Sequence, residues 1–160
     1  EGTYPLPEAQ LDRFMFNIWV DYPTFEEELE IVKSTTSSRK VEINPVVSGE
    51  EITFYQQLIR KMPVTDHLVE YAVKLVAKTR PGGDMAPDMV NQFLSWGAGP
   101  RASQNLIVAA KCHAALNGKY SPDIEDIKAV AVPILRHRIV RNYKAEAEGY
   151  TVEKIVSELF

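Results

Sequence analysis

The chain begins with EGTYPLPEAQLDRFMFNIWV (Glu1–Val20), which holds the one segment that we interpret as a strand. Pro7–Arg13 has the pattern of a short helix, because proline suits a first helical position. Phe14–Val20 is almost entirely apolar and rich in aromatic and β-branched residues, which is typical of a strand buried on both faces of a parallel sheet. We predict no other strand. A buried strand needs neighbours, so we expect residues 1–22 to be the end of an α/β core that lies mostly upstream.

The sequence after this segment predicts helices. Thr24 with Glu27 and Ser48 with Glu51 have the spacing of capping boxes and mark two helix starts. Ser121, followed by Pro122, marks a third start. The expected helices cover residues 25–36, 49–62, 66–79, 88–96, 101–117, 122–133 and 151–159. We therefore predict a mainly α protein, with a helical bundle over residues 23–160.

Length and composition restrict the class of protein. The 160 residues suit one domain, or one small domain with a remnant of another, and 45% apolar with 25% charged residues is ordinary for a soluble globular protein. No apolar run approaches the roughly 20 residues of a membrane span. The net charge of −4 argues against nucleic acid as a partner. Cys112 is the single cysteine, which excludes an internal disulfide and favours a reducing, cytoplasmic location.

Arg13 lies at the predicted end of the short helix, directly before the predicted strand. An arginine there sits at the rim of a sheet, where its planar, permanently charged fork could reach a phosphate bound by a neighbouring subunit. Such a group would stabilise the charge that develops during phosphoryl transfer. The alternative is a surface ion pair with Asp12 or Glu8, and spacing alone favours this plainer interpretation.

Arg101 follows a Gly-Ala-Gly-Pro turn and falls in the first turn of a predicted helix. Helix N-termini attract anions, so a cation at this place is unfavourable unless its side chain reaches an anion. Positions that break a local rule are often functional. The alternative is an ordinary exposed arginine, which spacing alone favours.

A basic cluster near the C-terminus contains Arg136, His137, Arg138, Arg141 and Lys144. If the segment is helical, Arg138, Arg141 and Lys144 share one face. This face would be a subunit interface or a patch near a nucleotide, or more simply a solvated surface balanced by Glu146 and Glu148.

Metal and nucleophile sites are not predicted. Cys112 and His113 are adjacent, but the chain has no second cysteine and no histidine four residues away, so a zinc site lacks ligands. A packed cysteine and a hydrogen-bonded histidine are the simpler interpretation.

Four segments together resemble the MoxR family of AAA+ ATPases. Gly2–Phe14 resembles the stretch between sensor 1 and the lid, and Trp96–Ser103 resembles the sensor 2 turn. Val64–His67 resembles a segment in the middle of the family's lid, and Leu135–Ile139 resembles one near its C-terminus. The similarity covers essentially the whole chain, and the first two motifs are long and specific.

The resemblance implies a fold and a set of site residues. Residues 1–22 would be the last helix and strand of the α/β AAA+ core, and residues 23–160 the all-helical lid. Arg13 matches the arginine finger, which acts on ATP in the adjacent subunit. Arg101 matches the sensor 2 arginine and, with Gly99 and Pro100, would contact the nucleotide of its own subunit.

The resemblance also implies ATP and Mg in the full-length protein, a homo-oligomer such as a hexameric ring, and chaperone-like remodelling of client protein complexes. A von Willebrand A-domain protein is a further implied partner. The chain has no Gly-x-x-x-x-Gly-Lys-[Ser/Thr] motif, and the Walker B acids also belong upstream. Alone, it should bind no nucleotide firmly and hydrolyse none.

The alternative function is a helical protein-interaction module with no nucleotide role. Substitutions of Arg13 and Arg101 distinguish the two, because an interaction module would tolerate them. An independent hydrolase or metalloenzyme has no catalytic constellation in this sequence.

Overall fold

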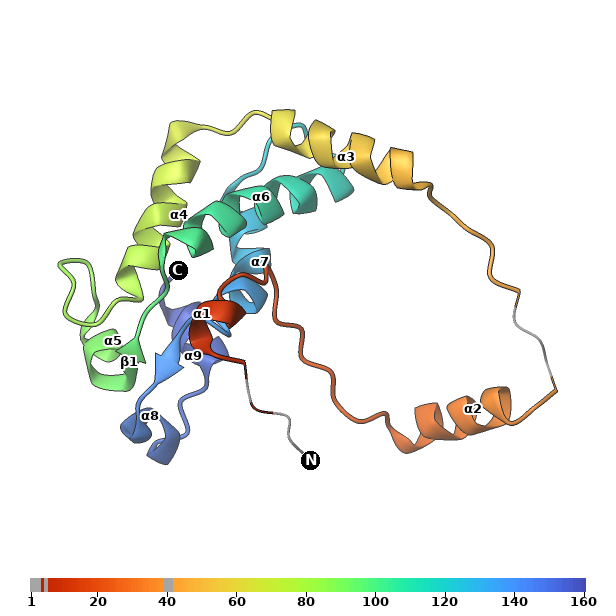
Figure 1. Cartoon of the computed structure of the whole chain (residues 1–160). Helices are drawn as coiled ribbons and strands as arrows, with labels where there is room; N and C mark the ends of the chain where they lie inside the picture. The colour runs from red at the N-terminus through yellow and green to blue at the C-terminus, as the bar shows by residue number, and fades with distance from the viewer. Residues whose placement is uncertain (1–3, 5, 39–41) are drawn as a thin grey trace.

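The computed structural model describes residues 4, 6–38 and 42–160, and these form a mainly helical protein (Figure 1). The elements are α1 (Glu8–Leu11), α2 (Phe25–Thr35), α3 (Gly49–Lys61), α4 (Asp66–Lys78), α5 (Asp88–Phe93), β1 (Leu94–Trp96), α6 (Pro100–Leu116), α7 (Ile124–Leu135), β2 (Val140–Arg141), α8 (Tyr143–Ala147) and α9 (Val152–Glu158). The predicted fold class is confirmed.

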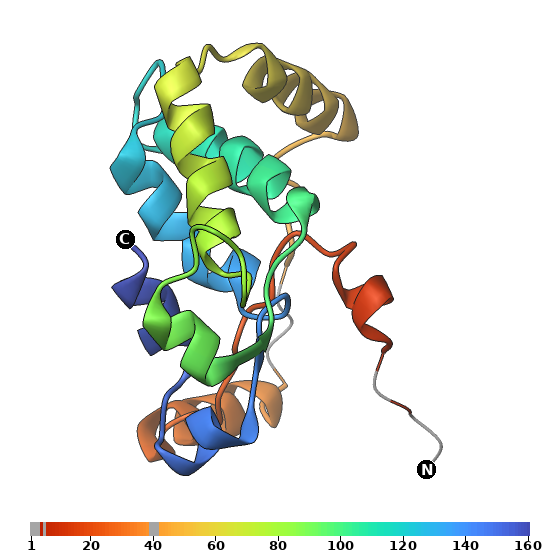
Figure 2. The ribbon, with the colours of Figure 1, turned by 90° about the vertical axis from the view of Figure 1, so that its left-hand side faces the viewer.

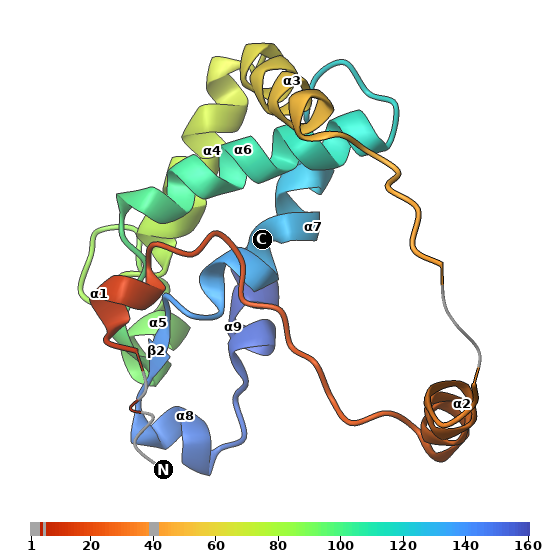
Figure 3. The ribbon, with the colours of Figure 1, turned by 45° about the vertical axis from the view of Figure 1, so that its right-hand side comes forward.

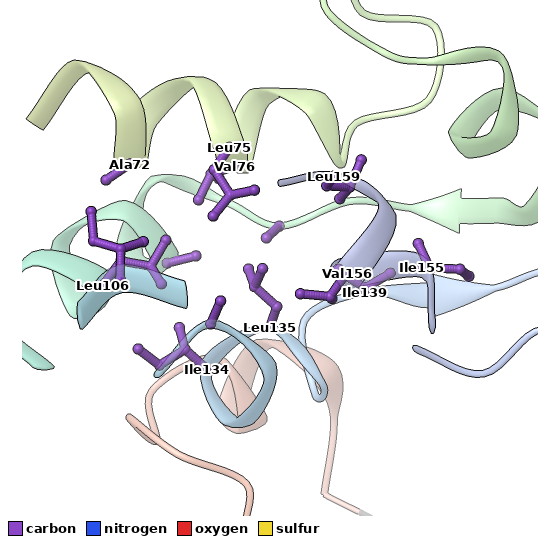
Figure 4. Packing of buried hydrophobic residues seen from close by; sticks show 14 of the residues in the cluster. Ala72, Leu75, Val76, Leu106, Ile134, Leu135, Ile139, Ile155, Val156 and Leu159 are labelled. Carbon is purple, nitrogen blue, oxygen red and sulfur yellow. The ribbon is translucent and has the colours of Figure 1, made fainter. Parts of the chain in front are cut away.

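The hydrophobic core lies between α4, α6, α7 and α9 (Figure 4). Leu75 and Val76 of α4 and Leu106 of α6 meet Ile134 and Leu135 of α7, all of them buried. The short helix α9 closes one end of this cluster with its apolar residues. Apolar side chains spaced three and four residues apart on α4 therefore produce the packing that the helical pattern predicts.

A two-stranded antiparallel sheet lies beside the bundle. Leu94 of β1 pairs with Arg141 of β2, and Trp96 pairs with Val140. The Phe93 ring stacks on Tyr150 at a centroid distance of 4.2 Å next to this sheet. The prediction of no strand in this region, with a helix over 88–96, is wrong in its last three residues. Strands this short carry too few residues for an alternating pattern to be recognised.

The strand predicted over Phe14–Val20 is not formed. Phe14 and Met15 lie in a bend, residues 16–20 have no regular secondary structure, and the only sheet in the described part of the chain is the β1–β2 pair. The Asn17 N–H donates to the Pro133 carbonyl at 2.8 Å, while Ile18 and Trp19 are 76% and 74% exposed. A strand requires a hydrogen-bonding neighbour, and the segment binds the end of α7 in its place. The domain division at residues 22 and 23 stays a prediction.

Helices α2 and α3 expose their apolar residues. The capping boxes at Thr24 and Ser48 are present, as predicted, but neither helix has a buried residue. Helix α2 stands away from the bundle at the end of an extended arm (Figures 1 and 3). Helix α3 lies along α6, and a groove of about 670 Å³ between them is lined by Met15, Tyr55 and Val108, among others.

Two predicted helix boundaries need correction at α7. The helix begins at Ile124 with Asp123 as its N-cap, where Ser121 was expected, because the Asp123 carboxylate accepts from the Asp126 N–H in a capping box. Pro133 was expected to end or kink the helix; it does not end it, because the helix continues to Leu135. Proline at this place removes only one bond near the helix end, so the last turn still forms.

Asp126 is the buried charged centre of the contact between α6 and α7. Its carboxylate accepts from His113 Nδ1–H at 2.7 Å, from Lys119 Nζ at 3.1 Å and from the Asp123 N–H at 2.8 Å. Burial by itself raises the pKa of this carboxyl, but the three donors outweigh it and lower the pKa to about 2. The charged form therefore stabilises the folded state.

The turn before α6 is fixed by the C-terminal end of α4. The Ala98 N–H donates to Thr79 Oγ1 at 2.9 Å, and Arg80 Nε donates to the Ala98 carbonyl at 2.9 Å. Gly97 passes so close to the Thr79 carbonyl that a Cβ would overlap it. These contacts set the direction in which Gly99 and Pro100 begin α6.

Asp126→Asn is expected to lower the free energy of unfolding at neutral pH by about 2 kcal/mol, because the pKa of Asp126 is about 2 where 3.8 is usual. A lowered pKa gives stability that is present above about pH 4 and lost as the pH falls toward about 2. Urea unfolding of wild type should therefore converge with that of the variant in acid. Glu125→Gln, at an exposed ion pair with Lys128, should match wild type at every pH. A constant difference between wild type and Asp126→Asn down to pH 2 would contradict this account.

Gly97→Ala should destabilise the protein by at least about 2 kcal/mol, since the new methyl group overlaps the Thr79 backbone. Gly99→Ala is the matched control two residues away, where a Cβ meets nothing within 4 Å, and should cost less than about 1 kcal/mol. Thermal unfolding of the two variants side by side checks this. Equal stabilities would show that the turn relaxes freely.

Candidate functional site

The site is built at the first turn of α6. Arg101 lies there, and its side chain is 48% exposed. Gly99 is the N-cap, with no side-chain cap, and the first turn contains no acidic residue. Pro100 at the first helical position has no N–H, and the Ala102 N–H donates to the Gly99 carbonyl at 3.0 Å. The Arg101 guanidinium and the positive end of the helix dipole are therefore the features here that suit an anion.

Asp12 lies between two arginines from distant parts of the chain. Arg101 Nη1 donates to Asp12 Oδ2 at 2.6 Å, and Arg138 Nε donates to Asp12 Oδ1 at 2.9 Å. Each carboxylate oxygen thus has its own cationic partner, one from the start of α6 and one from the turn after α7. Two positive groups share one negative charge, so the trio keeps a net positive charge.

Arg138 is the centre of this network. Its side chain is only 1% exposed, and it is the one arginine whose residue is buried in the described part of the chain. Nη2 donates to the carbonyls of Asp12 and Phe14 at 2.8 and 2.6 Å, and Nη1 donates to the carbonyls of Met15 and Ile134. A buried guanidinium is stable only when its donors are satisfied, and here the main chain of residues 12–15 supplies most of the acceptors.

The two residues before Arg138 bind the same segment. Arg136 Nη1 donates to the Asn17 carbonyl at 3.2 Å, and His137 Nε2 lies 3.0 Å from the Phe14 carbonyl, to which its N–H donates. Burial lowers the pKa of His137, which favours the neutral ring. The segment before α2 is therefore held on the end of α7 by three consecutive side chains.

Arg13 lies two residues after the end of α1, next to the C-cap Asp12, and is exposed. Its side chain has no hydrogen bond or ion pair with any residue that the structure describes. The predicted surface pair with Asp12 is not formed, because Arg101 and Arg138 occupy both oxygens of that carboxylate. The ion pair between Arg101 and Asp12 joins the segment of Arg13 to the start of α6, and α1 itself stands to one side of the bundle (Figure 2).

A cavity of about 180 Å³ lies beside this network, between α1 and the start of α6. It is lined by Asp12, Trp96, Gly97, Gly99 and Arg138, among others. Trp96 is 67% exposed there. Gly99 leaves the backbone of the turn open, since a Cβ there would meet nothing within 4 Å, whereas Gly97 lies against the Thr79 backbone.

The predicted basic face is not present. Arg138 lies in the turn after α7, Arg141 in β2 and Lys144 in α8, so the three do not share one helix. Arg141 Nη1 donates to the Tyr150 carbonyl at 2.7 Å, which is a structural contact. The irregular chain between α7 and α8 turns these side chains in different directions.

Cys112 and His113 have separate surroundings. Cys112 lines the groove between α3 and α6, and burial raises the pKa of its thiol. His113 bonds to Asp126. Within residues 4, 6–38 and 42–160, no group of three or more His, Cys, Asp or Glu side chains is arranged to hold a metal ion.

Sequence reasoning missed the roles of Asp12 and Arg138. Arg138 was one member of a basic cluster, and Asp12 was only a possible partner of Arg13. Their contact joins residues 126 positions apart, which no local spacing reveals. A signal was present in the sequence, since a basic residue directly after a helix can bind the free carbonyls at its end.

No helix among the described residues is long and apolar enough to cross a membrane.

Comparison with known proteins gives consistent results. Residues 87–159 match the model of the AAA lid domain. The chain is 36% identical over 160 residues to YeaC of Bacillus subtilis, covering 99% of this chain and 47% of YeaC. It is 35% identical over 159 residues to the chaperone MoxR1 of Mycobacterium tuberculosis, covering 99% of this chain and 42% of MoxR1. The chain thus spans about half the length of the curated relatives that it matches.

A solved structure shares the fold over the same extent. A crystal structure from Cytophaga hutchinsonii, of a protein described as a candidate ATPase, superposes with a TM-score of 0.88 and 37% identity. The match covers 99% of this chain and 48% of that one. The superposition therefore includes α1 and the segment between α1 and α2. Residues 87–159 form an AAA lid domain, and the chain as a whole belongs with the MoxR-type AAA+ proteins.

Proposed function

We propose that this chain is the lid and arginine-finger portion of a MoxR-type AAA+ ATPase that couples ATP hydrolysis in an oligomeric ring to the remodelling of client protein complexes. The observation that carries the proposal is the ion pair between Arg101 and Asp12, the residue next to Arg13. It brings together the two arginines that the family resemblance associates with nucleotide.

The geometry favours one shared nucleotide for both arginines. Arg13 is adjacent in the sequence to Asp12, whose carboxylate binds Arg101. The Cα atoms of Asp12 and Arg13 are about 3.8 Å apart, as in any two adjacent residues. Guanidinium groups carried by two segments that are joined in this way are suited to the separate oxygens of one triphosphate. If Arg13 acts on the ATP of the adjacent subunit, Arg101 of the same chain acts on that ATP as well. This differs from the sequence-based expectation that Arg101 serves its own subunit.

The residues present suit the phosphate groups of a nucleotide. The N-terminus of α6, with Gly99 and Pro100 in the turn, offers the positive end of a helix dipole, and Arg13 and Arg101 offer planar cationic forks. Such groups stabilise charge on a transferring phosphoryl group. Mg neutralises phosphate charge when it is bound with ATP, and the residues that hold it would lie outside this chain. The P-loop lysine would also lie outside this chain.

The exposed apolar surfaces support the proposal that another domain of the protein packs against this chain. Ile18 and Trp19 on the extended arm, and Phe25 and Ile31 on α2, are between 49% and 76% exposed. Together with the groove between α3 and α6, they form more apolar surface than an isolated bundle tolerates well. We infer that an α/β core packs against the arm and pairs with Phe14–Val20 as the predicted strand.

The proposal includes a homo-oligomeric ring, because a finger that acts in trans needs a neighbour. A hexamer, and a von Willebrand A-domain protein among the partners, follow from the resemblance alone and are included on that basis. The rival function, a helical interaction module, lacks a reason for Arg13 to be exposed beside the Arg101–Asp12 pair.

Arg13→Ala and Arg101→Ala in the intact protein should each lower ATP turnover by at least about 10²-fold while leaving the fold unchanged. Arg13 has no partner among the described residues, and Arg101 is itself half exposed in its pair with Asp12, so neither change should cost more than about 1 kcal/mol of stability. Steady-state phosphate release and thermal unfolding measure the two effects. Turnover equal to wild type in both variants would favour the interaction module.

Mixing the two variants tests whether the arginines share one nucleotide. Subunits with Arg13→Ala and subunits with Arg101→Ala are combined in one ring. If both arginines reach the neighbour's site, every donating subunit lacks one of them, and activity stays low at all mixing ratios. If Arg101 serves its own subunit, one quarter of the interfaces in an equal, random mixture is complete, and activity recovers to about that fraction.

A further inference from the structure

We propose that Asp12 is a positioning residue for nucleotide hydrolysis, which holds the Arg101 guanidinium in the orientation that meets the phosphate. The inference rests on the proposed function and adds to it a residue that neither the motifs nor the relatives identify. It starts from an asymmetry between the two arginines that bind this one carboxylate.

The Arg138 side of the carboxylate is fixed. Arg138 is 1% exposed, and its Nε, Nη1 and Nη2 atoms all donate to acceptors in residues 12–15 or at the end of α7. The Ile134 carbonyl among these acceptors belongs to the packed helix α7. Asp12 is therefore held by its side chain and by its own carbonyl against the bundle.

The Arg101 side of the carboxylate is open. The Arg101 side chain is 48% exposed, and its contact with Asp12 uses Nη1 alone. Nε and Nη2 form no hydrogen bond with any residue that the structure describes. These two atoms form the edge of a guanidinium that binds two oxygens side by side. Asp12 thus occupies one corner of the fork and leaves the edge suited to phosphate free.

The same arrangement positions Arg13. Arg138 holds the carbonyls of Asp12 and Phe14, the residues on either side of Arg13 in the chain. The backbone of Arg13 is thereby fixed while its side chain stays exposed. One buried guanidinium sets the place of the finger through the main chain, and sets the orientation of Arg101 through Asp12.

The charge balance suits a positioning role. An isolated carboxylate beside a phosphate site would repel the nucleotide, whereas this one is neutralised by Arg138. The network keeps one net positive charge at its exposed end, on Arg101. Flexible arginine side chains lose conformational freedom when they bind an anion, and an arginine that is already oriented loses less.

The test is ATP turnover by the intact protein with Asp12→Asn, which keeps the shape of the side chain and removes its charge. We expect kcat to fall about 10-fold to 10²-fold, as for other small misplacements of a catalytic group. Glu153→Gln is the matched control, because Glu153 binds the neighbouring Arg136 at 2.7 Å and lies outside the site. It should keep kcat within about 2-fold of wild type.

Repeating the Asp12→Asn change in a protein that already carries Arg101→Lys separates a positioning role from a general loss of structure. In Arg101→Lys protein a flexible ammonium replaces the planar fork, so no edge remains for Asp12 to orient. Asp12→Asn should lower kcat by less than about 2-fold in that background, because residues that act through one another do not add. If Asp12→Asn fails to fold, Asp12→Glu, which keeps the charge that Arg138 needs, replaces it in the same comparison.

Each outcome has one meaning. A fall in kcat that needs Arg101 supports the inference. A kcat equal to that of Glu153→Gln, or an equal fall in both backgrounds, overturns it while the proposed function stands. If the intact protein shows no turnover, or if Arg101→Ala turns over like wild type, the proposed function fails and this inference fails with it.

Discussion

The buried Arg138 guanidinium organises the junction between the N-terminal segment and the helical bundle. It lies just after the last turn of α7, where helix carbonyls have no partner within the helix. The Asn17 N–H satisfies the Pro133 carbonyl, and Arg138 satisfies that of Ile134. The segment that binds Arg138 therefore also completes the end of α7. A cation near a helix C-terminus is also favoured by the helix dipole.

This junction explains how an irregular segment has a defined place. Residues 12–17 contain neither a helix nor a strand, yet their carbonyls accept hydrogen bonds from Arg136, His137 and Arg138. Burying a guanidinium costs much free energy unless all its donors are bonded, so alternative positions of the segment are disfavoured. Specific placement of α1, and with it of Arg13, follows from polar contacts rather than from apolar packing.

Local patterns in the sequence predicted most of the helical fold. The capping boxes at Thr24 and Ser48 and the apolar face of α4 appear in the structure as expected. Patterns of this kind depend on residues three or four apart, which the sequence displays directly. The β1–β2 pair was not predicted, because two short strands far apart in the sequence leave little periodic signal. Phe14–Val20 has a strand's composition, but pairing depends on a neighbour that composition cannot supply.

The site was predicted in part for the same reason. Arg13 and Arg101 stand in long, recognisable motifs, whereas Asp12 and Arg138 act through contacts between residues far apart in the chain. The basic residues after α7 could be seen as a group, but not which one is buried. Only the fold separates the buried Arg138 from the partly exposed Arg136 and Arg141.

The central claim is that Arg138 holds α1 at the start of α6. It is tested most directly by the distance between spin labels at Gln10→Cys on α1 and Gln104→Cys on α6, both exposed positions, in a Cys112→Ser protein. The account predicts one narrow distribution of short distances, which broadens and lengthens when Arg138→Met is added while the bundle stays folded. A broad distribution with Arg138 present, or a narrow one that Arg138→Met leaves unchanged, would contradict it.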